Sequence, residues 1–288
     1  MNRNLRKGTG RSTVKRFGSG QGKPVISIAI LAVIVLGCLL AGVIAGQDPY
    51  YMHTDQISQA PSMEHFFGTD TLGRDIFAII WHGGRISLTV GLWATLLSTV
   101  IAVIYGCVSG LAGPRVDDLM MRFTEILMSV PQILLVIFAQ AIWGEATIMS
   151  IGTVIGLTSW MAVAKMVRSE VRQMRNAEFV LAAKSMGAGF FYILWHHLMP
   201  NFMSAIMFMI VTNLGSAIAM EATLSFLGLG LPTNVISWGS LMSLSQNAML
   251  TGAWWLLLIP GIFLVITLIC ITEIGESLRT QNRRDKLI

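Results

Sequence analysis

Residues 178–200 read EFVLAAKSMGAGFFYILWHHLMP and lie between two strongly apolar stretches of the chain. Apolar residues recur here at spacings of three and four, which predicts a helix with one apolar face. These residues are Phe179, Ala183, Met186, Phe190 and Leu194. Gly187 and Gly189 predict a bend in the middle, and Pro200 suits the first turn of a following helix. A short helix tied to apolar segments at both ends cannot form a core, so we expect it to bind another molecule.

The composition of the whole chain indicates a membrane protein. Of its 288 residues, 54% are hydrophobic and 12% are charged, whereas soluble domains carry about 25% charged residues. Several charge-free apolar runs reach the roughly 20 residues that a transmembrane helix needs. We therefore predict an all-α polytopic membrane protein with six transmembrane helices. The predicted spans are residues 24–46, 86–112, 126–144, 146–164, 198–220 and 254–272.

The positions of the basic residues predict the orientation of these spans. With the N-terminus in the cytoplasm, the cytoplasmic segments contain 18 of the 20 Lys and Arg residues, and only Arg74 and Arg85 lie on the opposite side. The positive-inside rule therefore places both termini in the cytoplasm. The net charge of +5 is then explained by basic residues that lie against an anionic membrane surface, so it does not indicate nucleic-acid binding. The cytoplasmic segments are residues 1–24, 113–125, 165–197 and 273–288.

The same pattern divides the chain into five parts. They are a basic tail (1–23), the first span (24–46), an extracytoplasmic segment (47–85), a core of five spans (86–275) and a cytoplasmic tail (276–288). The stretch 178–200 lies within the core, on the cytoplasmic side. The pattern of residues 47–85 is too short to define a separate domain.

The stretch 178–200 resembles the EAA loop of ATP-binding-cassette importer permeases. The family pattern is Glu-Ala-Ala, three residues, Gly, nine residues, then Ile-x-Leu-Pro, and its spacing is kept here. The matching residues are Ala182, Ala183, Gly187 and Pro200. Leu181, His197 and Met199 replace the Glu, Ile and Leu of the pattern. The resemblance implies a cytoplasmic coupling helix that contacts an ATPase through Ala182, Ala183, Gly187, Phe190 and Pro200.

Motifs elsewhere extend the resemblance to most of the chain, from about residue 25 to residue 280. Residues 67–75 read FGTDTLGRD, which resembles a signature of the C-type subunit of the dipeptide/oligopeptide/nickel permease family. Residues 84–88 (GRISL), 224–230 (LSFLGLG), 237–239 (SWG) and 275–279 (GESLR) resemble further motifs of that family in the same order. Glu276 takes the place of an Asp in the last motif.

This resemblance implies a fold, partners and a cargo. The fold is that of a type I importer permease in the bacterial inner membrane. The partners are a homologous second permease, two ATP-binding subunits, an extracytoplasmic solute-binding protein and the lipid bilayer. ATP and Mg²⁺ bind to the partner subunits, and this chain binds no cofactor. The expected cargo is a di- or oligopeptide, with nickel or a metal chelate as the alternative within the family.

The motif in residues 67–75 has two possible roles. Gly68 and Gly73 permit turns, while Asp70, Arg74 and Asp75 can pair locally. The residues therefore fit an extracytoplasmic turn held by ion pairs and helix capping. The alternative is direct contact with the substrate.

Glu221 is the only acidic residue between positions 198 and 272. Ionisable groups at membrane depth tend to line transport pathways or to pair with a partner. We therefore consider Glu221 a possible pathway or gate residue. The alternative is a carboxylate at the outer interface, or one that caps the helix break between residues 223 and 230.

The sequence offers no motif for catalysis or metal binding. It has no GxxxxGK[ST] phosphate-binding loop, no HExxH, no GxSxG and no paired Cys motif, so we expect no enzyme activity and no metal site. Cys38, Cys107 and Cys270 each lie within a predicted span. A membrane-embedded enzyme would need several polar groups facing one cavity. An ion-coupled carrier would need several ionisable groups near the membrane midplane. Neither pattern is apparent, and ATP dependence of uptake distinguishes the carrier from the permease.

Overall fold

The computed structural model of the chain describes residues 24–46, 48–53, 55–232, 234–246 and 252–285. The basic tail, residues 1–23, lies outside these residues. Within them the structure is helical and contains no strand, only an isolated bridge between Thr69 and Asp75. The helices are α1 Val25–Leu39, α2 Ala41–Ile44, α3 Ile76–Leu111, α4 Pro114–Met128, α5 Gln132–Trp143, α6 Ile148–Met174, α7 Glu178–Ser185, α8 Phe190–Ile193, the π-helical turn η1 Leu194–Leu198, α9 Met199–Phe226, α10 Trp238–Leu244 and α11 Trp255–Asp285.

The predicted all-helical membrane fold is confirmed, while the number of spans differs in detail from six. Among the described residues, four helical segments are long and apolar enough to cross a membrane: Ile76–Leu111, Ile148–Met174, Phe191–Phe226 and Trp255–Gln281. Helices α4 and α5 together qualify as a fifth span, bent by 89°. Helix α1 has 15 residues, fewer than the roughly 20 that a span needs, and α2 follows it after one residue.

Two helices differ in extent from the predicted spans, and local chemistry explains both differences. Helix α3 begins at Ile76 rather than near residue 86, because the Asp75 side chain accepts a hydrogen bond from the amide of Phe77 and caps the helix. The predicted third span, 126–144, is interrupted before Gln132. Pro131 disfavours helical geometry at the residue before it and has no amide to continue the helix.

Helices α3 and α6 form the centre of the bundle and approach each other closely. A Cβ atom at Gly106 would lie 2.7 Å from the carbonyl oxygen of Ala164, and one at Gly156 would lie 2.9 Å from that of Ala94. Small residues at these positions allow the backbones to pack together, as is common in membrane helices.

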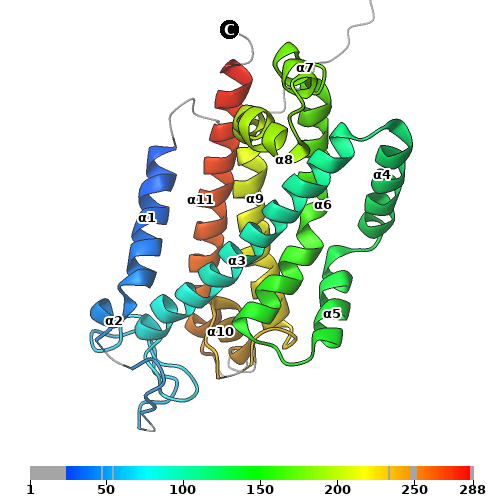
Figure 1. The fold of residues 1–288 in the computed structure, drawn as a ribbon. Helices are drawn as coiled ribbons and strands as arrows, with labels where there is room; N and C mark the ends of the chain where they lie inside the picture. The colour runs from blue at the N-terminus through cyan, green and yellow to red at the C-terminus, as the bar shows by residue number, and fades with distance from the viewer. Residues whose placement is uncertain (1–23, 47, 54, 233, 247–251, 286–288) are drawn as a thin grey trace, which may run out of the picture.

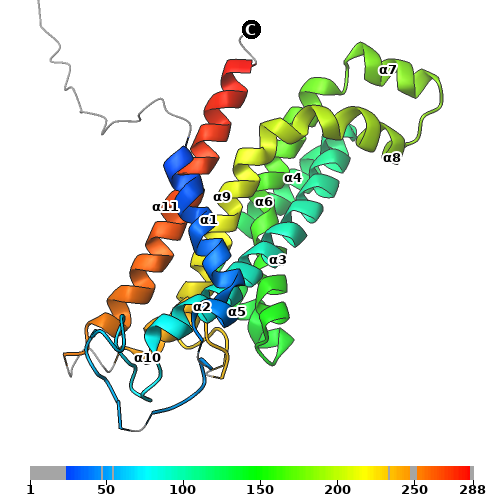
Figure 2. The same ribbon diagram turned by 90° about the vertical axis from the view of Figure 1, so that its left-hand side faces the viewer.

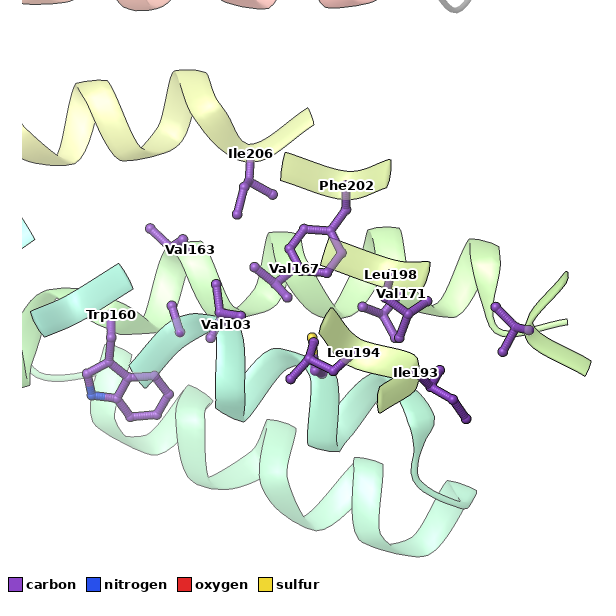
Figure 3. Close-up of a cluster of buried hydrophobic side chains, with 14 of the residues drawn as sticks. Val103, Trp160, Val163, Val167, Val171, Ile193, Leu194, Leu198, Phe202 and Ile206 are labelled. Atoms are coloured by element: carbon purple, nitrogen blue, oxygen red, sulfur yellow. The ribbon is translucent and has the colours of Figure 1, made fainter. Parts of the chain in front are cut away.

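The largest hydrophobic cluster joins this pair to the segment after α7. Figure 3 shows side chains of α3, α6, the α8–η1 segment and α9 gathered at one place. Leu194 and Leu198 of η1 are buried there together with Val167 and Phe202. The end of residues 178–200 is therefore fixed firmly to the bundle.

The two ends of the bundle differ in structure. Helices α7 and α8 extend beyond α6 and α9 at the end where α11 also terminates (Figures 1 and 2). We name this the basic end, because Arg168, Arg172, Lys184 and Arg279 belong to the elements that reach it. Helix α10 and the loop before α3 lie at the opposite end, which we name the α10 end.

Candidate functional site

The predicted bend in residues 178–200 is present and is made by Gly187. This residue has a φ of +80°, a conformation that glycine adopts far more readily than other residues. The amide of Gly187 donates to the carbonyl of Lys184, and the amide of Ala188 donates to the carbonyl of Ala183, both at 3.0 Å. This pair of bonds is the Schellman motif that ends helices at a left-handed glycine. Pro200 lies in the first turn of α9, as predicted.

The single apolar face predicted for this stretch is wrong, because the turn at Gly187 divides it. Ala183 and Leu194 are buried against the bundle, whereas Phe179 and Met186 are 42% and 81% exposed. The side chain of Phe190 lies outside the described part of the chain. The exposed apolar residues form what we name the tip patch: Phe179, Leu181, Met186, Phe191, Tyr192 and Trp195.

The tip patch is an exposed apolar surface around the turn at Gly187. A Cβ atom added at Gly187 or at Gly189 would meet no atom within 4 Å, and Ala182 is exposed. Exposed apolar side chains gathered on one projection are typical of a binding site for another protein or a membrane. The patch lies at the far tip of the basic end (Figure 2).

A buried carboxylate with two partly exposed arginines lies at the base of this projection. Asp117, in the first turn of α4, accepts hydrogen bonds from Arg168 and Arg172 of α6, at 2.5 Å and 2.8 Å, and from Ser109 of α3 at 2.6 Å. The guanidinium of Arg168 is the main reason that the pKa of Asp117 is lowered to about 2. The Asp117 side chain is buried.

The motif in residues 67–75 forms a compact turn at the α10 end. The Asp70 carboxylate pairs with the Arg74 guanidinium at 2.6 Å, and both side chains are buried. Gly68 and Gly73 have positive φ. A Cβ atom at Gly73 would lie 1.8 Å from the carbonyl oxygen of His53. Asp75 caps α3 beside this turn, so the geometry is that of a turn held by an ion pair and a helix cap. The alternative of substrate contact stays untested.

Glu221 lies near the C-terminal end of α9 and has no exposed surface. Its carboxylate accepts hydrogen bonds from Ser87 of α3 and Ser225 of α9, each at 2.9 Å. It also hydrogen-bonds to Ser237, the residue that caps α10. A cavity of about 440 Å³ lies beside this group, and Ser225 contributes to its wall. Glu221 is thus held inside the protein rather than at a lipid interface.

Comparison with known proteins identifies the chain. Residues 102–279, more than half of its length, match the family described as the binding-protein-dependent transport system inner membrane component. The chain belongs to this permease family. It is 41% identical over 222 residues to the dipeptide transport system permease protein DppC of Bacillus subtilis, which covers 76% of this chain and 68% of that protein. It is 36% identical over 269 residues to the oligopeptide transport system permease protein OppC of the same organism, covering 93% and 87% of the two chains. The OppC protein of Haemophilus influenzae is 39% identical over 260 residues, covering 88% and 82%.

Family membership makes this chain a transport component of the inner membrane and not an enzyme. The matched region contains both the tip patch and Glu221, while the 67–75 turn precedes it. Within the described part of the permease, no three His, Cys, Asp or Glu side chains gather as metal ligands.

Sequence reasoning missed the partners of both buried carboxylates. The pairing of Asp117 with Arg168 joins residues 51 positions apart, and the bond between Glu221 and Ser87 joins residues 134 positions apart. The available signal was a set of serines inside otherwise apolar helices. It does not say which serine faces which acid.

Proposed function

We propose that this permease forms half of the translocation path of an ATP-driven importer of di- or oligopeptides. The relatives named above are dipeptide and oligopeptide permeases that match most of this chain. Their names support a peptide cargo rather than nickel. The solute-binding protein makes the first selection among peptides, so residues of this chain need not distinguish them.

The tip patch is the observation that carries the coupling part of this proposal. It presents apolar and aromatic side chains on a projection whose final residues, Leu194 and Leu198, are buried against α3 and α6. Ala182 is exposed on this projection, and a Cβ atom added at Gly187 would meet no atom within 4 Å. A groove on an ATP-binding subunit fits such a helix. Movement of that subunit during ATP binding and hydrolysis then moves the spans.

The distribution of charge supports the orientation. Arg168 and Arg172 lie near the C-terminal end of α6 and Lys184 lies in α7, whereas Arg74 precedes α3 and Arg85 lies in its first three turns. The end of α6 and α7 are at the basic end, and the start of α3 is at the α10 end (Figure 1). The positive-inside rule therefore places the basic end and both termini in the cytoplasm, where ATP is available. The α10 end then faces the solute-binding protein.

The complete transporter contains this chain, a homologous second permease as its heterodimer partner, two ATP-binding subunits and the binding protein. ATP and Mg²⁺ bind to the ATP-binding subunits, and this chain holds no cofactor. The sequence supports that division of labour because it lacks a phosphate-binding loop.

Uptake into proteoliposomes tests this function. The assembled complex is reconstituted with ATP inside, and the binding protein and a radiolabelled peptide are added outside. We expect uptake that requires hydrolysable ATP and continues when a proton ionophore abolishes the pH gradient. Uptake that follows the ion gradient and ignores ATP would instead identify an ion-coupled carrier.

A further inference from the structure

Each serine that binds Glu221 also accepts a backbone N–H group from residues 231–240. The pairs, with the serine first, are Ser87 and Trp238 (3.3 Å), Ser225 and Leu231 (3.3 Å), and Ser237 and Ser240 (3.1 Å). All three serines are buried. The carboxylate is therefore connected through hydroxyl groups to three amides of the loop after α9 and the first turn of α10.

The direction of these bonds follows from the chemistry of the hydroxyl group. A serine has one proton to donate, and its oxygen accepts the backbone N–H. Each serine gives its proton to Glu221, which must accept at every position. An ionised carboxylate does this because it has two acceptor oxygens and donates nothing. An amide in its place would turn an N–H toward a buried hydroxyl, whose own proton would then have no acceptor.

Close packing places the first turn of α10 directly on α9 and α3. A Cβ atom at Gly239 would lie 2.6 Å from the backbone of Ala222, and one at Gly84 would lie 2.6 Å from the ring of Trp238. The Trp238 indole also donates to the carbonyl of Ile80 at 2.9 Å. This second anchor holds α10 itself and does not involve Glu221. The loop before Ser237 is held by the burial of Leu231 and Ile236 and by the bond from the Leu231 amide to Ser225, which binds the carboxylate.

We propose that Glu221 is a positioning residue whose carboxylate, through Ser87, Ser225 and Ser237, fixes residues 231–232 and 234–240 on α3 and α9. This segment forms one wall of the 440 Å³ cavity, and Glu145 of the α5–α6 turn lies on the cavity wall as well. The position of the segment therefore sets the opening of the cavity at the α10 end. That this segment is part of an outer gate rests on the proposed function. The hydrogen-bonded link between Glu221 and the segment, which we name the tether, is tested without any measurement of transport.

A spin label at Asn234 measures the tether. Asn234 is exposed, lines the cavity and lies between Leu231 and Ser237. The label is attached to Asn234→Cys in the full transporter, with the three native cysteines replaced. In Glu221→Gln we expect the ratio of mobile to ordered label to rise about tenfold, the equilibrium equivalent of one hydrogen bond to a charged group. The matched control is Thr223→Ala, since Thr223 is exposed on the same helix and its hydroxyl donates to the carbonyl of Ala219. Its spectrum should equal that of the unsubstituted protein.

A second variant keeps the proposal testable if Glu221→Gln fails to assemble. Ser87→Ala removes one hydroxyl link and should mobilise the label in the same direction by a smaller factor. An unchanged label spectrum in Glu221→Gln, or in Ser87→Ala when only that variant assembles, overturns the positioning role. Loss of peptide uptake with an unchanged spectrum overturns it too. That result leaves the transport function intact, because uptake by the unsubstituted protein tests that function separately.

Discussion

The carboxylate of Asp117 on α4 binds the guanidinium of Arg168 on α6, with Oδ1 and Nε 2.5 Å apart. Arg168 lies in the last two turns of α6, directly before the projection that carries the tip patch. Ser109 of α3 donates to the same carboxylate. Asp117 therefore joins three helices at the base of the proposed coupling element.

We expect Asp117→Asn to lower the thermal unfolding midpoint of the purified transporter. The substitution removes the charge that binds Arg168 and Arg172, and one hydrogen bond between charged groups contributes about 2 kcal/mol. Asp118→Asn is the matched control, because it removes an exposed charge next to it. Equal midpoints for the Asp117→Asn variant and the unsubstituted protein would show that the ion pair contributes nothing to stability.

The pH dependence of this contribution follows from the lowered pKa. Folding lowers the pKa of Asp117 from 3.8 to about 2, so the ionised form is favoured in the folded state. The stabilisation is complete above the unfolded pKa and is lost as the pH falls toward 2. The difference in unfolding midpoint between Asp117→Asn and the unsubstituted protein should therefore stay constant near neutral pH and shrink below about pH 4. A difference that changes between about pH 6 and 8 would point to another titrating group.

Alanine substitutions at two glycines with positive φ distinguish the cost of backbone strain from the cost of a steric clash. Gly73→Ala places a Cβ atom 1.8 Å from a backbone oxygen, whereas Gly46→Ala meets nothing within 4 Å, and both residues have positive φ. A left-handed non-glycine residue costs roughly 1–2 kcal/mol. We expect Gly46→Ala to lose no more than this and Gly73→Ala to lose the folded 67–75 turn. Protease sensitivity of that turn measures the difference, and equal sensitivity in the two variants would refute the steric explanation.

Labelling with an impermeant thiol reagent tests the orientation. Met63 is 91% exposed in the loop before α3, and Thr280 is exposed near the C-terminal end of α11. In a background without the native cysteines, Met63→Cys should react in intact cells, whereas Thr280→Cys should react only after the membrane is opened. Labelling of Thr280→Cys in intact cells would reverse the proposed topology.

The sequence predicted the class of fold because charge-free runs leave few alternatives in a membrane. It also located the bend at Gly187, since glycine is the residue that a left-handed helix end requires. It failed where distant residues decide the structure. The cap by Asp75 places the start of α3 at Ile76. Pro131 interrupts the apolar run 126–144, which hydropathy alone predicts to be one continuous helix. The hydroxyl partners of Glu221 come from three helices, and spacing along one chain does not indicate such contacts.

The most direct test of the account is photo-crosslinking from the tip patch. A photoreactive amino acid at Met186, the most exposed residue of the patch at 81%, is irradiated in the assembled transporter. We predict a covalent adduct with an ATP-binding subunit, and none with that subunit from the same amino acid at Met63. Crosslinking from Met186 only to lipid or to other membrane subunits, in a complex that hydrolyses ATP and imports peptide, would contradict coupling through residues 178–200.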